Sequence, residues 1–187
     1  MLLKLDLSKS FDKLSWTFLE RMLLAFGFDR IWVSWIKNLT SSTFFSILVN
    51  GSPSQPFKAS RGIRQGDPLS PFIFILMMAW LGRMLTTARV NYDIKGIKLH
   101  PGDEAHTHQQ FVDDTMLMGY VFIQEARSII SGLDMFLEAS GLEINEDKSE
   151  VFFFNSSQVN RRNILRILRF KEGLLPNKYL GAPLFES

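Results

Sequence analysis

The apolar and polar positions of this chain change their period several times, which predicts a mixture of short strands and amphipathic helices. Residues 2–7 (LLKLDL) are almost continuously apolar, as in a strand that is covered on both faces. Apolar side chains then recur at helical spacing between Ser15, a predicted N-cap, and Gly27, a predicted helix stop. The side chains expected on the buried face of this helix are Leu14, Phe18, Met22 and Phe26.

A second helix is predicted over residues 29–39, with Asp29 as its N-cap. Its apolar residues recur at intervals of four, and we expect this stripe to face the core: Ile31, Trp35 and Leu39. The longest apolar run, residues 71–82, is too short to span a bilayer and predicts a buried helix. Ser70 is the expected N-cap of that helix and Pro71 its first residue.

The remaining segments predict hairpins and further helices, so that strands and helices alternate irregularly. A β-hairpin is predicted over residues 42–60, because Asn50-Gly51 readily adopts the positive φ angles of a tight turn. The other expected elements are a short strand at 94–100, a polar loop at 101–107, strand–turn–strand at 108–119, helices at 123–140 (ended by Gly141) and 159–170, a strand at 149–155 and an extended piece at 178–185. This order predicts the α+β class.

Composition and charge narrow the possible functions only slightly. The chain has 187 residues, 46% of them hydrophobic, which is enough for one domain with a substantial core. The absence of cysteine from the sequence excludes disulfides and a thiolate zinc site, and it suits an intracellular protein. The formal net charge of +2 is low for a nucleic-acid-binding domain. The basic segment 158–171 could follow phosphates or could be a solvated helix face.

Carboxylates interrupt two of the apolar strands. Asp6 stands where a purely structural pattern would have another apolar residue, and Asp113 and Asp114 are adjacent in the strand–turn–strand segment. Partly buried carboxylates repel one another and need an arginine or a metal ion as a partner. Clustered oxygen ligands suit Mg²⁺, and two such ions can stabilise a phosphoryl transfer. The alternative is a salt-bridged or exposed aspartate pair at the tip of a hairpin.

Three segments, in this order, resemble the palm of a reverse transcriptase: LDLSKSFDKLSW (5–16), RGIRQGDPLSPFIFIL (61–76) and FVDD (111–114). GLEINEDKSEVF (141–152) and KYLGAPL (178–184) are similar to two further motifs of that family. The non-LTR (LINE-like) retrotransposon type, in a plant-type form, is the most similar, and group II intron enzymes are next. The resemblance implies an antiparallel sheet that carries the carboxylates and packs on helices. It also implies that residues 1–187 are a single, truncated palm domain without fingers and thumb.

The resemblance assigns roles to the acidic residues. Asp6 and Asp113 are the implied ligands of two Mg²⁺ ions, with Asp114 beside them and the Leu7 carbonyl contributing. The motif lysine, Lys148, is the implied proton donor to the leaving pyrophosphate, or otherwise an ordinary surface charge. No catalytic role follows for Asp12, and the spacing of His100, His106 and His108 is more typical of a polar loop than of a metal site.

The resemblance also implies how substrates are held. Phe11 is implied to exclude a ribose 2′-hydroxyl, with a core phenylalanine as the alternative. Gln65, Gly66 and Arg61 are implied to lie along the incoming nucleotide and the template, although a solvated loop is an equal alternative for Arg61. The implied primer grip consists of Tyr179, Leu180 and Gly181.

Two functions are therefore expected as alternatives. The first is an RNA-directed DNA polymerase fragment, with an RNA template, a DNA primer and dNTPs as partners, no membrane partner, and a location in the nucleus or cytoplasm. The second is an inactive retrotransposon remnant that at most binds nucleic acid. Two departures from the family pattern bear on activity: Val112 replaces a more usual alanine, and Gln109 replaces a more usual apolar residue. The oligomeric state does not follow from the sequence.

Overall fold

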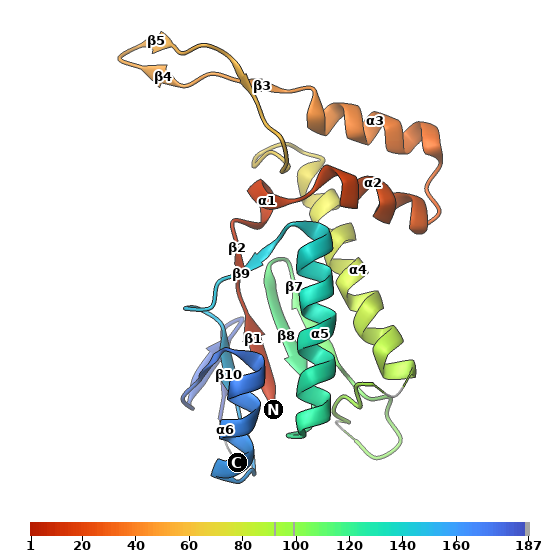
Figure 1. The fold of residues 1–187 in the computed structure, drawn as a ribbon, viewed down its shortest axis with the longest axis vertical. Helices are drawn as coiled ribbons and strands as arrows, with labels where there is room; N and C mark the ends of the chain where they lie inside the picture. Colours follow the sequence, from red (N-terminus) through yellow and green to blue (C-terminus); the bar gives the residue numbers. More distant parts are fainter. Residues whose placement is uncertain (92, 99, 186–187) are drawn as a thin grey trace.

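The fold is built on a five-stranded sheet, seen in a computed structural model that describes residues 1–91, 93–98 and 100–185 (Figure 1). The strand order is β11-β10-β1-β8-β7. The central strand β1 (Leu2–Leu5) pairs antiparallel with β10 (Glu150–Phe152) and with β8 (Asp114–Met118). The edge strand β7 (His108–Phe111) is also antiparallel, whereas β11 (Lys171–Glu172) runs parallel to β10. The sheet is thus mixed, although every strand next to the carboxylates is antiparallel as predicted.

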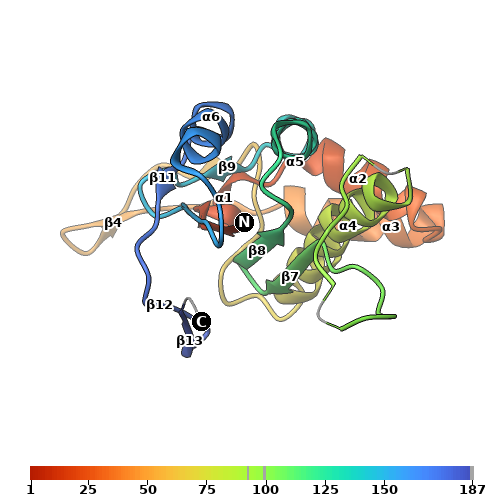
Figure 2. The same cartoon turned by 90° about the horizontal axis from the view of Figure 1, so that it is seen from below.

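The two faces of the sheet are covered differently. Helices α5 (Ile123–Ser140) and α6 (Gln158–Leu168) lie on one face, and the hairpin of β12 (Asn177–Tyr179) and β13 (Ala182–Leu184) lies on the other (Figure 2). The core forms on the helix side, where the fully buried side chains include Leu3, Leu117, Phe136, Val151 and Ile164. The predicted helix at 159–170 is confirmed as α6, the strand predicted at 149–155 is present but shorter, as β10, and the predicted extended piece at 178–185 is a hairpin.

The helices α1 (Ser10–Lys13), α2 (Trp16–Ala25) and α3 (Arg30–Ser41) gather at one end of the sheet (Figure 1). Helix α2 begins as predicted, because the Ser15 hydroxyl accepts a hydrogen bond from the Phe18 N–H at 3.3 Å. Three of its four predicted inward residues are buried and the fourth, Phe26, is partly buried against the core.

The predicted orientation of α3 is wrong. Its N-cap is Asp29 as expected, but Ile31, Trp35 and Leu39 are 63%, 59% and 56% exposed. The buried residues of the helix are Val33 and Ile36. The helix carries two apolar stripes, and periodicity cannot choose between them because the choice depends on the surface that α2 offers.

This orientation of α3 predicts losses of stability of very different size for two similar substitutions. Ile36→Ala is expected to lower the free energy of unfolding by about 3 kcal/mol, since it opens a cavity in the core. Ile31→Ala removes the same atoms from a solvated face and is expected to change it by less than about 0.5 kcal/mol. Urea unfolding followed by circular dichroism measures both. Equal losses would mean that the exposed stripe is covered in solution.

Helix α4 (Ser70–Val90) starts close to the predicted position, but its N-cap is Leu69 and Ser70 is already helical, so the predicted cap is wrong by one residue. The Asp67 carboxylate accepts from the Leu69 N–H at 2.8 Å and satisfies this end of the helix. By length and composition alone, α4 could cross a membrane, and it is the single described helix to which this applies. Here its apolar residues pack in the core, among them Phe74 and Met77.

The long hairpin predicted at 42–60 is confirmed. Inner strands β4 (Leu48–Val49) and β5 (Ser52–Pro53) are joined by Asn50-Gly51, with φ angles of 51° and 81°. Outer strands β3 (Phe44–Phe45) and β6 (Phe57–Lys58) pair at its base. The hairpin projects away from the sheet (Figure 1).

The strand predicted at 94–100 is wrong. In the described part of this segment there is only an isolated bridge between Ile97 and His106, and Leu99 lies outside the described residues. The buried Glu125 carboxylate accepts two backbone N–H groups that a strand would need for its ladder, those of Lys95 and Gly96. A buried side chain distant in sequence therefore replaces the expected strand.

Candidate functional site

Two of the three predicted carboxylates lie at the same end of the central sheet. Asp6 follows β1, and Asp114 opens β8. Leu5 lies opposite Thr115 in the last pair of this antiparallel register, so Asp6 and Asp114 each lie one residue from that terminal pair. The fold thus brings two aspartates from distant parts of the sequence to one end of the sheet.

Asp113 lies in the turn between β7 and β8. Phe111 pairs with Asp114, which leaves Val112 and Asp113 as the two central residues of the hairpin. Val112 has φ 54°, which is an unusual conformation for a β-branched residue. A hairpin turn that needs a positive φ at its first central position normally has glycine there. The turn therefore holds backbone strain next to the carboxylates, as functional sites often do.

These aspartates are free of ion pairs in the described part of the chain. The Asp6 N–H donates to the Ser149 hydroxyl at 3.1 Å, and its carbonyl accepts from the Asn145 N–H at 2.8 Å, so its backbone is fixed. The salt-bridged alternative is therefore not what the described residues contain.

The donor set fits a divalent cation in kind, since hard cations take carboxylate oxygens. Within the described residues, however, no three acidic or histidine side chains come together as a metal-binding group. Asp6 and Asp114 are half-buried at this end of the sheet and Asp113 is exposed in the turn, and the convergence of the three carboxylates on metal ions stays a prediction.

The residues around Asp6 occupy defined positions. Leu7 opens β2 (Leu7–Ser8), which pairs with β9 (Glu143–Ile144). Phe11 stacks on Phe74 of α4, with ring centroids 5.0 Å apart and an interplanar angle of 12°. This contact is the core packing considered as the alternative for Phe11, and its role beside a sugar stays a prediction.

The loop that carries Arg61, Gln65 and Gly66 is fastened to the segment after Asp6. The Trp16 indole N–H donates to the Gly62 carbonyl at 2.7 Å, and the Ile63 N–H donates to the Phe11 carbonyl at 2.7 Å. A hollow of about 520 Å³ opens beside this loop; its lining includes Asp12, Thr40, Phe45, Arg61, Arg64 and Gln65. Trp16 is not among the predicted site residues; its indole N–H donor was the available signal.

Lys148 is exposed in a turn between β9 and β10. Its own N–H donates to the Asn145 carbonyl at 3.2 Å, and this turn is joined to the Asp6 backbone at both Asn145 and Ser149. Lys148 therefore stands on a segment anchored to Asp6, while its role as a proton donor stays a prediction.

The predicted primer-grip residues form the end of β12 and its turn. Tyr179 is buried, and its hydroxyl donates towards the Asp114 carbonyl at 3.2 Å and the Gln109 carbonyl at 3.4 Å. Burial, together with the nearby Asp114 charge, raises the pKa of the Tyr179 phenol. Leu180 and Gly181 make the exposed turn of the hairpin.

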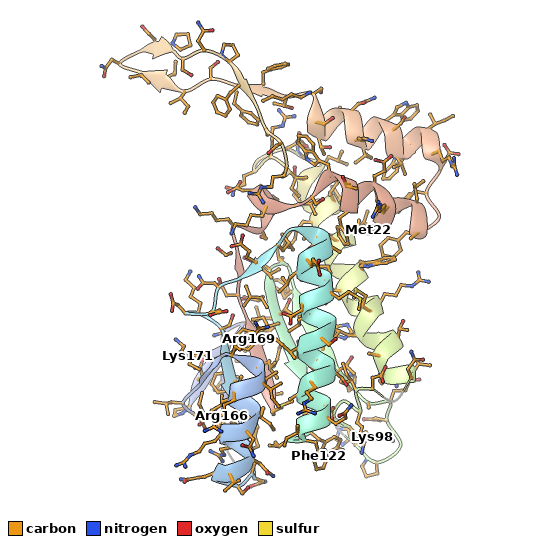
Figure 3. The ribbon with its side chains drawn as sticks, viewed as in Figure 1. Met22, Lys98, Phe122, Arg166, Arg169 and Lys171 are labelled. Atoms are coloured by element: carbon orange, nitrogen blue, oxygen red, sulfur yellow. The ribbon has the colours of Figure 1, made fainter. Side chains whose placement is uncertain are left out.

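The basic segment 158–171 is largely a solvated, ion-paired surface. Figure 3 labels Arg166, Arg169 and Lys171 in and after α6. Arg169 pairs with Asp134 at 3.0 Å, and Lys171 lies 3.8 Å from the Glu150 carboxylate. Arg161, in the same segment, pairs with Glu172 at 3.2 Å. These pairs agree with the solvated-face alternative.

His108 makes a local contact in place of a metal site. Its Nδ1 lies 2.9 Å from the Thr107 hydroxyl, and burial lowers the pKa of its imidazole. Because the folded chain resists protonation of His108, the unfolded chain takes up the proton first as the pH falls.

Stability is therefore expected to be complete above about pH 6.5 and to fall as the pH is lowered through this value. His108→Gln should flatten this part of the profile, which urea unfolding at pH 7.5, 6.5 and 5.5 measures. His100→Gln, in an exposed loop, is the matched control and should keep the wild-type profile.

Comparisons with known proteins point to one family. Residues 1–184 match the family described as Reverse transcriptase (RNA-dependent DNA polymerase). The chain is 33% identical over 144 residues to a Retrovirus-related Pol polyprotein from a type-2 retrotransposable element of Drosophila melanogaster; this match covers 77% of the chain and 13% of that protein. It is 31% identical over 113 residues to an uncharacterized mitochondrial protein of Arabidopsis thaliana, which covers 60% of the chain and 92% of that protein.

The fold is similar to that of a telomerase from Candida albicans, solved in complex with a fragment of telomeric RNA. The TM-score is 0.62 at 14% identity, over 84% of this chain and 27% of the telomerase chain. This likeness shows the fold alone, and it confirms the predicted α+β, palm-like class. The chain spans only a small part of the length of the Drosophila polyprotein and of the telomerase.

Proposed function

Since the chain belongs to the reverse transcriptase family, we propose that it is the palm of an RNA-directed DNA polymerase of a non-LTR retrotransposon. In this proposal, a primer 3′-hydroxyl attacks the α-phosphate of a dNTP, and pyrophosphate leaves. The observation that carries it is that Asp6, after β1, and Asp114, at the start of β8, lie at the same end of the sheet with no ion-pair partner among the described residues. The intracellular location and the plant-type subgroup remain predictions.

Reverse transcriptases generally use divalent metal ions, and we propose two Mg²⁺ ions for this chain. Asp6 and Asp113 would be the principal ligands, with Asp114 beside them and the Leu7 carbonyl contributing. Bound there, the ions would stabilise charge on the attacking and leaving oxygens. The carboxylates themselves orient the site, since their backbones are fixed by the sheet and by the Asn145 and Ser149 contacts.

Other residues would handle the substrates. Arg61 and Gln65 line the hollow beside the loop 61–66, where an arginine can bind phosphate and Gly66 allows a close approach of the backbone. Phe11 would restrict the sugar to the deoxy form. Lys148 would donate a proton to pyrophosphate. The exposed Leu180-Gly181 turn would contact the primer end.

A primer-extension assay tests this function. An oligo-dT primer on a poly-rA template should be extended by the purified chain with dTTP and Mg²⁺, and chelation with EDTA should stop the reaction. A chain that is folded by circular dichroism and binds the primer–template without extending it would support the alternative, a nucleic-acid-binding remnant. The nature of the nucleotide tests Phe11: UTP should be incorporated far less than dTTP.

A further inference from the structure

The β12–β13 hairpin crosses the face of the sheet that carries Asp6 and Asp114. Asn177 donates from its side chain to Glu150 on β10 at 3.2 Å. The Lys4 ammonium on β1 donates to the Lys178 carbonyl at 3.2 Å. Consecutive residues of β12 thus reach consecutive strands of the sheet, and the hydroxyl of the next residue, Tyr179, reaches backbone carbonyls of β8 and β7.

Tyr179 is the anchor of this crossing. It is 6% exposed, whereas the neighbouring Leu180 is 46% exposed. A ring this deeply buried is poorly placed to contact a primer. Its hydroxyl instead lies 3.2 Å from the Asp114 carbonyl and 3.4 Å from the Gln109 carbonyl.

The two carbonyls belong to the two arms of the β7–β8 hairpin, on either side of the Val112-Asp113 turn. One hydroxyl proton is shared between them, so Tyr179 bridges the arms just below the turn. Val112 holds a positive φ in that turn, which the surrounding structure must maintain. The Tyr179 hydroxyl comes from outside the five-stranded sheet and contacts the backbone on both sides of this turn.

We propose that Tyr179 is a positioning residue for the carboxylates: its hydroxyl fixes the tip of the β7–β8 hairpin and thereby the direction of Asp113 and Asp114. This rests on the proposed polymerase function and changes the role expected for Tyr179 from a primer contact to a clamp on the hairpin. In this arrangement Leu180 and Gly181 contact the primer end. Tyr179, in the same β12–β13 hairpin, contacts the β7–β8 hairpin that carries the carboxylates.

The test removes a single hydroxyl, in Tyr179→Phe, with Tyr120→Phe as the matched control on an exposed loop. Amide hydrogen exchange in residues 109–116 should become about five- to tenfold faster in Tyr179→Phe, as expected for the loss of one hydrogen bond. The kcat of single-nucleotide addition should fall by a similar factor while the KM for dTTP stays within twofold of the wild-type value. Tyr120→Phe should leave both measurements unchanged.

Each result has one consequence. Unchanged exchange in residues 109–116 overturns the clamp, whether or not the chain is active. Faster exchange with an unchanged kcat makes the contact merely structural and overturns the positioning role. A rise in KM for the primer with an unchanged kcat restores the direct primer contact. If the wild-type chain extends no primer, the proposed function fails, and hydrogen exchange alone then decides the clamp.

Discussion

Asp6→Asn is expected to lower the rate of primer extension by on the order of 10³-fold or more. The substitution keeps the size of the side chain and replaces the charged carboxylate, which a divalent cation prefers as a ligand, by a neutral amide. Without metal, it should leave the chain as stable as the wild type or slightly more stable, because one of the negative charges at this end of the sheet is removed. Single-turnover extension and urea unfolding in EDTA measure the two effects.

The control for this prediction is Asp134→Asn. Asp134 pairs with Arg169 on the surface of α5, away from the carboxylate pair, and its loss should cost less than about 1 kcal/mol and no activity. Mg²⁺ should raise the melting temperature of the wild type and of Asp134→Asn, but less so that of Asp6→Asn. Equal stabilisation of all three by Mg²⁺ would place the cation elsewhere.

Gly62→Ala is expected to lower the free energy of unfolding by about 3 kcal/mol. Gly62 has φ 91°, and an added Cβ would lie 2.7 Å from the Asp12 carbonyl oxygen and 3.0 Å from that of Phe11. The α1 segment that carries Phe11 and Asp12 cannot yield, because the Gly62 N–H donates to the Leu14 carbonyl at 2.8 Å and the neighbouring Ile63 N–H donates to the Phe11 carbonyl. The substitution should therefore also displace the loop 61–66 and weaken nucleotide binding.

Gly51→Ala separates the two causes of this loss. Gly51 has a similar φ of 81° but nothing within 4 Å of an added Cβ, so only the backbone strain of about 1 kcal/mol remains. Thermal unfolding of the two variants compares them directly. Equal losses would show that the close approach of Gly62 to the segment after Asp6 contributes nothing.

The features that the sequence predicted correctly are helix ends and turns, which depend on a few adjacent residues. The Ser15 cap, the Asn50-Gly51 turn and the end of α5 at Gly141 are confirmed, because each depends on the preference of a few adjacent residues. The failures are equally specific. At the start of α4, the side chain that accepts a backbone N–H is Asp67 and not Ser70. Near residue 95, the Glu125 carboxylate accepts the backbone N–H groups that a strand would have used for its ladder.

In the candidate site, too, the sequence shows the residue types but not their arrangement in space. The sequence identified Asp6, Asp113 and Asp114 as carboxylates out of place in apolar strands, and the motif order pointed to the family. It could not tell that Asp6 and Asp114 come to the same end of the sheet while Asp113 stays in the turn, since this depends on the register of β1 against β8. Trp16 was missed because its partner, the Gly62 carbonyl, is a backbone atom distant in sequence.

The sequence by itself determined most of the helices and hairpins, the order of the motifs and the presence of acidic residues in two apolar segments. These depend on spacing and on residue type, which are local properties of the chain. Only the tertiary structure decided which stripe of α3 is buried, that Asp6 and Asp114 lie at the same end of the sheet, and that Tyr179 reaches the carbonyl of Asp114. Burial and proximity depend on the partner surface and on strand register, and neither is written in the period of a single segment.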